Sequence, residues 1–211
     1  MNFVGHIVVA DRAARGASTA YLLGAAAPDL ARMARLPVAD DGSDDFRSGV
    51  ASHHRADAAF HDLPWFRTRN RALVGELTAR GVRRGPARGA AHVLVELLLD
   101  GALLADDGHA ATFAPAWTSL SGADADARAM VPADGCERWL DFLGQLTRRL
   151  DPAAYADAGY AADRTAGTLS RRPRLAMSDD EHAVLRMLAA DVQPDVAASA
   201  DEVVDAVLAA A

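Results

Sequence analysis

The sequence of 211 residues contains a single cysteine, Cys136, and no lysine among its 22 basic residues. One cysteine excludes an internal disulfide and is typical of a chain that works in a reducing compartment. Aromatic residues make up only 6% of the chain, so large anchoring side chains are few. We interpret the absence of lysine as a consequence of genomic base composition, because arginine replaces it everywhere.

Long apolar runs and an excess of positive charge are also missing. The longest apolar candidate, residues 92–105, is shorter than the ~18 residues of a membrane helix and carries Glu96 and Asp100. The apolar start of the chain has no positively charged region before it and contains His6, unlike a secretory signal. The formal net charge of −7 argues against a general nucleic-acid binder. We therefore expect a cytoplasmic protein with no membrane span and no nucleic-acid partner.

Hydrophobic residues make up 51% of the chain, with alanine dominant, and they recur with helical spacing. Strand signals are weak, because period-two alternation and Asn-Gly or Asp-Gly hairpin turns are almost absent. The pattern predicts an all-α protein with one compact domain. Residues 1–108 would form the core that holds the functional site, and residues 109–211 would add helices that pack on this core.

Helix boundaries follow from capping and breaking residues. Pro28 is expected to break the first main helix, because proline removes a backbone donor and disfavours helix at the preceding residue. Two capping boxes, Ser178 with Glu181 and Ser199 with Glu202, are expected to open the last two helices. Helices are predicted over residues 18–35, 44–61, 63–80, 86–105, 136–150, 153–162, 179–191 and 200–210.

Three of the seven histidines lie within residues 52–62. Because a helix turns by about 100° per residue, His54, Asp57 and His61 share one face. Burying two imidazoles and a carboxylate is costly unless they pair with each other or bind a cation. For His54 with Asp57 a metal site is favoured over a buried structural pair, whereas His53 and His61 are more often solvated neighbours.

A second stripe lies on the helix predicted over residues 86–105, where His92 and Glu96 are one turn apart. Glu96 stands in an apolar run, so its carboxylate either pairs or binds a cation. Asp100 is interpreted as solvated at the end of this helix. Imidazoles and carboxylates from several helices are the ligands of zinc, iron or manganese. The predicted metal ligands are His6, Asp29, His54, Asp57, His92 and Glu96.

One or two cations held by these ligands would form hydroxide from water near neutral pH and polarise a phosphoryl or acyl oxygen. In this hypothesis Arg55 stabilises charge on the phosphoryl oxygens, and His61 is the reserve candidate for the general acid. The chain has no His-Glu-x-x-His, Cys-x-x-Cys or Gly-x-Ser-x-Gly motif. We therefore expect a metal-dependent hydrolase that cleaves a phosphoester.

Short motifs in the first half of the chain form a recognisable series. Residues 1–6 read Met-Asn-Phe-Val-Gly-His, and Leu-Leu-Gly at residues 22–24 is followed by Asp29. Residues 49–64 contain a glycine, then His-Arg-Ala-Asp, Phe-His-Asp and a final proline. This series resembles Met-Asn-Phe-Leu-Ala-His, Leu-Leu-Gly with a nearby aspartate, and Gly…His-Arg-x-Asp…Phe-Thr-Asp…Pro of the bacterial acyl carrier protein phosphodiesterases.

The resemblance covers residues 1–104 and implies an HD-phosphohydrolase-like helical bundle that releases phosphopantetheine from the carrier protein. It implies Mn²⁺ as the cofactor, with Zn²⁺ or Fe²⁺ as alternatives, and an acidic carrier protein or a small phosphoester as the partner. Arginines within residues 67–88 would dock such a carrier, or would form a solvated helix face. Where the family has Asp-x-x-x-Asp-His, this chain has residues His92–Leu97, with one histidine and one glutamate.

Two further functions stay open. The scaffold is also compatible with a non-catalytic helical protein that binds a ligand or partner in the same pocket. In addition, Gly24 followed by Ala27-Pro28-Asp29 is similar to the Gly-x-x-x-Pro-Asp of bacterial zinc-dependent phospholipase-C-like proteins. That fainter likeness implies a metal-dependent hydrolase of lipid phosphoesters.

Overall fold

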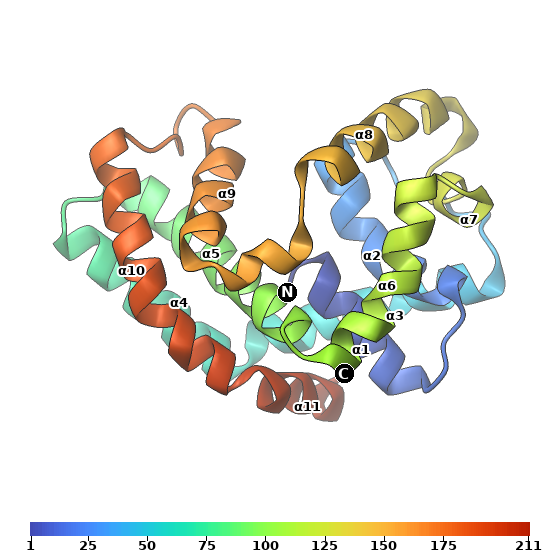
Figure 1. Cartoon of the computed structure of the whole chain (residues 1–211), viewed down its shortest axis with the longest axis horizontal. Coiled ribbons are helices and arrows are strands. Elements are labelled where there is room, and N and C mark those ends of the chain that lie inside the picture. Colours follow the sequence, from blue (N-terminus) through green and yellow to red (C-terminus); the bar gives the residue numbers. More distant parts are fainter.

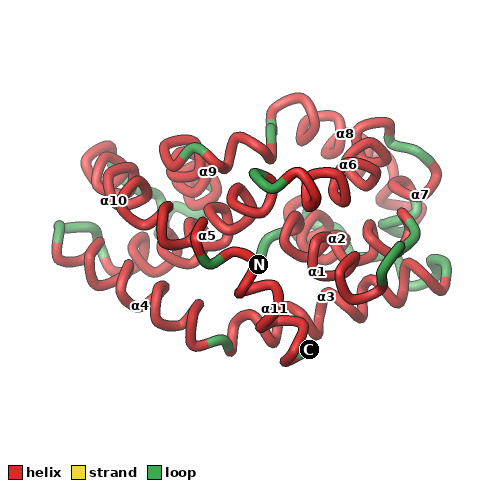
Figure 2. The backbone as a smooth tube through the Cα atoms, turned by 60° about the horizontal axis from the view of Figure 1, so that its bottom comes forward, coloured by secondary structure: helices red, strands yellow, loops and turns green.

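The computed structural model describes residues 1–211 as helices joined by short loops, with no strands (Figure 2). The predicted all-α fold is confirmed, and no helix combines the length and the apolar character needed to cross a bilayer. The α-helices are α1 (Phe3–Ala14), α2 (Thr19–Ala34), α3 (Asp44–Asp62), α4 (Pro64–Ala79), α5 (Arg84–Leu104), α6 (Asp107–Gly122), α7 (Ala125–Arg128), α8 (Cys136–Arg149), α9 (Ala158–Ser170), α10 (Asp179–Ala198) and α11 (Ala200–Ala210). Two short 3₁₀ helices are η1 (Ala133–Gly135) and η2 (Pro152–Ala156).

The helices fall into two groups (Figure 1). Helices α4, α5, α9 and α10 form one group, and α1, α2, α3, α6, α7 and α8 form the other. Helix α1 contacts α5 across the junction, and α11 lies against α1 and α3. A single core of 54 buried hydrophobic residues runs through both groups. The start of the chain therefore lies where the two groups meet, next to the middle of α5.

Helix α3, which carries the histidine-rich stripe, has well-defined ends. The Ser43 hydroxyl accepts a hydrogen bond from the backbone N–H of Phe46 at 3.2 Å. Asp44 and Asp45 occupy the first turn, where the helix dipole favours negative charge. Pro64 begins α4 and prevents α3 from continuing. The sequence predicted this helix to within one residue.

Three predictions about the other helices need correction. The capping box of Ser178 and Glu181 is present, but Ser199 makes no side-chain cap. Its hydroxyl instead donates to the Asp195 carbonyl at 2.7 Å and accepts from Nε1 of Trp65 at 2.9 Å. The helix predicted over residues 153–162 is divided between η2 and α9, and α10 runs beyond residue 191 to its end at residue 198.

Helix α2 continues through Pro28, contrary to prediction. The turns before Pro28 are buried on all sides, since residues 22–27 are all buried, and this packing offsets the roughly 3 kcal/mol that an interior proline costs. Gly24 and Gly49 allow the backbones of α2 and α3 to touch. A Cβ on Gly24 would lie 2.2 Å from the Phe46 carbonyl oxygen, and one on Gly49 would lie 2.1 Å from that of Tyr21. This glycine crossing fixes the register of α3 on α2.

Candidate metal centre

A polar cavity of about 310 Å³ lies where the start of the chain meets α2, α3 and α5. Only one of its 11 lining residues is hydrophobic, so the cavity is not built for an apolar ligand. The lining is formed by Met1, Asn2, Pro28, Asp29, Arg32, His53, His54, Asp57, His61, His92 and Glu96. Imidazoles and carboxylates therefore supply the chemistry of this cavity.

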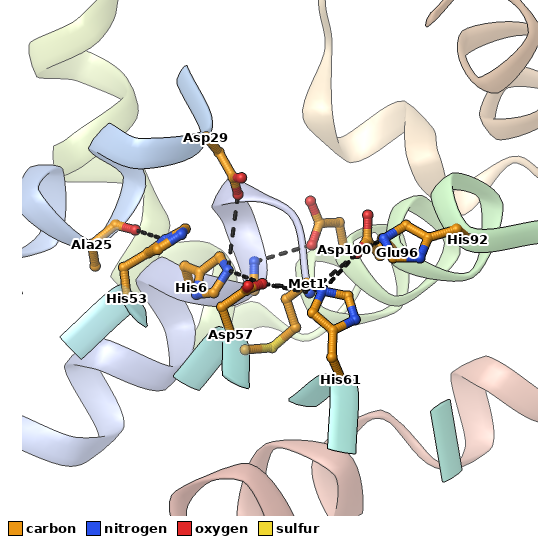
Figure 3. A network of polar contacts seen from close by, with 11 residues as sticks. Met1, His6, Ala25, Asp29, His53, Asp57, His61, His92, Glu96 and Asp100 are labelled. Atoms are coloured by element: carbon orange, nitrogen blue, oxygen red, sulfur yellow. Dashed lines mark hydrogen bonds and ion pairs between the residues drawn. The ribbon is translucent and has the colours of Figure 1, made fainter. Parts of the chain in front are cut away.

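His6, Asp29 and His53 form what we call the inner cluster, with one residue each from α1, α2 and α3 (Figure 3). One ligand atom from each lies within 4.8 Å of the others, and Nε2 of His6 is 3.9 Å from Oδ2 of Asp29. Nδ1 of His53 is 2.9 Å from the carbonyl oxygen of Ala25. Because a carbonyl only accepts, Nδ1 carries the hydrogen, and Nε2 of His53 keeps a lone pair for a cation.

The inner cluster is buried and short of hydrogen-bond partners. His6 is 1% exposed, and neither of its ring nitrogens has a partner, nor has Oδ2 of Asp29. Burial lowers the pKa of His6 to about 3 and that of His53 to about 4, and it raises the pKa of Asp29 to about 7. Both imidazoles are therefore neutral at pH 7, which is the form that binds metals. Since buried polar atoms in native proteins are nearly always paired, these atoms are candidate ligands of a cation.

His61, His92 and Glu96 form the outer cluster, between α3 and α5. Oε1 of Glu96 is 3.1 Å from Nε2 of His92 and 3.6 Å from Nε2 of His61. The two imidazoles stack with centroids 4.9 Å apart, and the ring of Phe66 packs edge-on against both. Burial opposes ionisation of Glu96, but the Met1 amino group and His92 more than offset it and lower the pKa of Glu96 to about 2.

Asp57 of α3 joins the two clusters. Its Oδ1 lies 3.6 Å from Nε2 of His6 and 3.2 Å from Nε2 of His61. Burial alone would raise the pKa of Asp57, but the two imidazoles and the Met1 amino group hold it well below its usual range. That amino group is 3.9 Å from Oδ1 of Asp57 and 3.4 Å from Oε1 of Glu96, so positive charge is stabilised beside both carboxylates. A carboxylate within reach of both clusters has the position of a bridging ligand.

The structure brings five of the six predicted ligands into these contacts and leaves out the sixth. His54 lines the cavity but is exposed and belongs to neither cluster, while its neighbour His53 does. On α3, His53, Asp57 and His61 follow one another at four-residue steps, and His54 stands on an adjacent stripe.

Spacing alone does not separate the two histidines. The signal that does is Gly49, one turn before His53, which marks the side of α3 that faces α2. The five ligands that the structure brings together are His6, Asp29, Asp57, His92 and Glu96.

The two residues predicted to act in catalysis lie in different places. Arg55 is exposed and does not line the cavity, so the structure does not bring it to the clusters. His61, predicted as a general acid, lies among the outer ligands. Arg32 of α2, which sequence analysis did not single out, lines the cavity instead.

Asp100 is buried and not solvated as predicted. It is 0% exposed, its Oδ1 accepts the backbone N–H of Gly5 at 3.0 Å, and its Oδ2 has no partner. Burial raises the pKa of Asp100 to about 8. Its hydrogen bond ties the first turn of α1, and so His6, to α5. Sequence reasoning missed this role because nothing in the apolar run around Asp100 indicates that α1 packs there.

Glu96 and Asp100 have the spacing of the two aspartates in the Asp-x-x-x-Asp-His pattern quoted above. They lie four residues later than His92 and Glu96, the pair with which the sequence analysis compared these aspartates. The residue after Asp100, where that pattern has a histidine, is Gly101 in this chain. A Cβ at Gly101 would lie 2.2 Å from the carbonyl carbon of Tyr155 in η2, so no side chain fits there.

Comparisons with known proteins gave no match: no family model, curated protein or solved structure matches this chain. The resemblance described above is carried by short motifs. Three residues of these motifs, His6, Asp29 and Asp57, lie within the candidate metal centre or in contact with it.

Proposed function

We propose that the cavity binds two divalent cations and that the protein is a metal-dependent phosphoester hydrolase. The inner cluster would bind one cation, the outer cluster a second, and Asp57 would bridge them. The observation that carries this proposal is a buried imidazole, His6, that forms no hydrogen bond at either nitrogen. Its Nε2 lies 3.6 Å from Oδ1 of Asp57 and 3.9 Å from Oδ2 of Asp29, which also forms no hydrogen bond. A cation between them would satisfy atoms that otherwise remain unpaired away from water.

The separations between ligand atoms support this assignment. Two atoms that bind one ion at ~2.1 Å can be at most about 4.2 Å apart. Nε2 of His6 and Oδ2 of Asp29 are 3.9 Å apart, and Oε1 of Glu96 lies 3.1 and 3.6 Å from the two outer imidazoles. Small side-chain movements would therefore close each cluster on an ion.

The charge of the lining supports a phosphoester substrate only with metal present. Three acidic side chains, Asp29, Asp57 and Glu96, face two positive groups, the guanidinium of Arg32 and the amino group of Met1. Without metal, this excess of negative charge would repel a phosphate. Two divalent cations would reverse the sign of the site and attract it. When bound, they would supply a water molecule with a lowered pKa and polarise a phosphoryl oxygen.

The protein side chains contribute orientation to this chemistry. The Ala25 carbonyl fixes the tautomer of His53, and the glycine crossing holds its ring in place. Phe66 packs against the two outer imidazoles and restricts their rotation. The resemblance to the acyl carrier protein phosphodiesterases favours an HD-like arrangement and manganese, and these two remain parts of the proposal; the phosphopantetheinyl carrier protein that it also implies is weighed against a small phosphoester below.

A small phosphoester is favoured over an acidic carrier protein by the state of the arginines within residues 67–88. Several of them are already engaged: Arg67 pairs with Asp62, Arg80 with Glu76 and Arg83 with Glu181, while Arg69 lies over the ring of Trp65. Fewer guanidinium groups are therefore free to dock a partner than the sequence indicates.

The test is a titration of metal-depleted protein with Mn²⁺ by calorimetry, followed by assays with p-nitrophenyl phosphate and bis(p-nitrophenyl) phosphate. We expect two ions per chain, a rise in the melting temperature and turnover of one of the esters. His6→Ala should lose metal and activity. The control His182→Ala should keep both, because its imidazole pairs with Asp163 and neither residue lines the cavity. A protein that binds no Mn²⁺ and melts at an unchanged temperature would contradict the proposal. Two bound ions without turnover would favour a non-catalytic binding protein.

A further inference from the structure

Arg32 is the only arginine among the residues that line the cavity, and the chain has no lysine. It lies on α2 one turn after Asp29 and is exposed. Its guanidinium forms no ion pair or hydrogen bond with another residue, unlike Arg67, Arg80 and Arg83. A cation without a protein partner therefore stands at the rim of the metal centre.

The absence of a pair between Arg32 and Asp29 is informative. Residues three apart on a helix can form an ion pair, and such pairs are worth a few tenths of a kcal/mol. Here Oδ2 of Asp29 is directed at His6, 3.9 Å from its Nε2. The carboxylate of Asp29 is thus committed to the inner cluster, and the donors of Arg32 stay available. A planar guanidinium binds phosphoryl oxygens through two parallel hydrogen bonds.

We infer that Arg32 binds the phosphoryl group of the substrate from the open side of the cavity, opposite the cations. This inference rests on the proposed function, because the Arg32 guanidinium and the Met1 amino group together do not outweigh the three lining acidic side chains. It assigns to Arg32 the role that the sequence predicted for Arg55. The continuity of α2 through Pro28 makes the role feasible, because it keeps Asp29 and Arg32 on neighbouring faces of one helix.

The test uses inorganic phosphate as the probe and full-length protein loaded with Mn²⁺. Calorimetry would compare the wild type with Arg32→Ala, Arg32→Lys and the matched control Arg55→Ala, an exposed arginine outside the cavity. We expect Arg32→Ala to weaken phosphate binding by about tenfold or more, which is the usual value of a charge-assisted hydrogen bond. Arg32→Lys should recover part of the affinity, because the ammonium group keeps the positive charge but cannot form the two parallel hydrogen bonds of a guanidinium. Arg55→Ala should stay within about twofold of the wild type.

Each variant would first be checked for Mn²⁺ stoichiometry and melting temperature, so that loss of metal is separated from loss of phosphate. Equal phosphate affinity in Arg32→Ala and the wild type would overturn the inference. A loaded wild type that binds no phosphate would also overturn it, while leaving the metal centre intact. A wild type that takes up no Mn²⁺ would instead show, before phosphate is added, that the proposed function has failed.

Discussion

The inner and outer clusters contain the same kinds of side chain in different surroundings. The inner histidines, His6 and His53, are 1% and 5% exposed, whereas the side chains of the outer ones, His61 and His92, are 30% and 43% exposed. The inner residues come from three helices, and the outer ones from two. Burial removes water as an alternative partner, so only the inner cluster is left with unpaired atoms. We therefore expect a tightly held inner cation and a more readily exchanged outer one, next to the entering substrate.

The largest effect is expected at Asp57, because it serves both clusters. Asp57→Asn keeps the shape and removes the charge that the two cations would share. We expect both Mn²⁺ affinities to fall, and turnover to drop by more than about a hundredfold. The control is Asp62→Asn on the same helix, an exposed residue whose contact is Arg67. If calorimetry finds two ions bound to Asp57→Asn with wild-type affinity, Asp57 does not bridge the two cations.

An intermediate effect separates the two clusters. His53→Ala should abolish the tighter class of Mn²⁺ binding, and His92→Ala should abolish the weaker class and leave one ion per chain. His54→Ala, one residue along α3 from the first variant, should retain both ions. Titration of the three variants under the same conditions would measure this. If His54→Ala loses an ion and His53→Ala does not, the register of α3 on α2 described above is wrong.

The smallest effect is a pH dependence of the metal-free protein. Burial raises the pKa of Asp29 to about 7 and that of Asp100 to about 8, from an unfolded value of 3.8, so the native state holds these protons more tightly. The free energy of unfolding therefore falls as pH rises toward 8 and levels off above it. Below pH 6.5 the lowered pKa values of His6 and His53 act in the opposite direction, because the unfolded histidines take up protons there.

Asp100→Asn tests this dependence. The charged groups around Asp100 are the carboxylates of Glu96 and Asp29 and the Met1 amino group. Between pH 7 and 8 in EDTA, the wild type should lose about 1 kcal/mol, a fall of about 2–4 °C in melting temperature. The variant should show a smaller fall over the same interval. A wild-type melting temperature that rises from pH 7 to 8 would refute the buried, protonated state of Asp100.

The sequence was sufficient for the fold class and for the chemical character of the site. Helical spacing of apolar residues and the caps at Ser43 and Ser178 specify where helices form, because these signals are local. Histidines and acids at one-turn spacing on two helices indicate a cation site, because burying such groups without a ligand is costly.

The features that the sequence did not predict depend on how the helices pack against one another, and local sequence patterns do not determine this packing. Pro28 is tolerated within α2 because of burial against other helices, and His53 is favoured over His54 because two glycines set the crossing of α2 and α3. Asp100 becomes a buried acceptor only when α1 lies against α5. Arg32 was overlooked because an unbroken α2 was needed to bring it to the cavity.

The packing of η2 on Gly101 brings the second half of the chain next to the candidate metal centre, although that half supplies none of its candidate ligands. The backbone of Tyr155 lies against Gly101, the neighbour of Asp100 in α5, and Asp100 is fully buried. A fragment ending at residue 108 would thus possess both sets of ligands and still leave this anchor of α1 open to hydration. We expect such a fragment to bind metal poorly, because the hydrogen bond from Gly5 to Asp100 that positions His6 would be weakened by water.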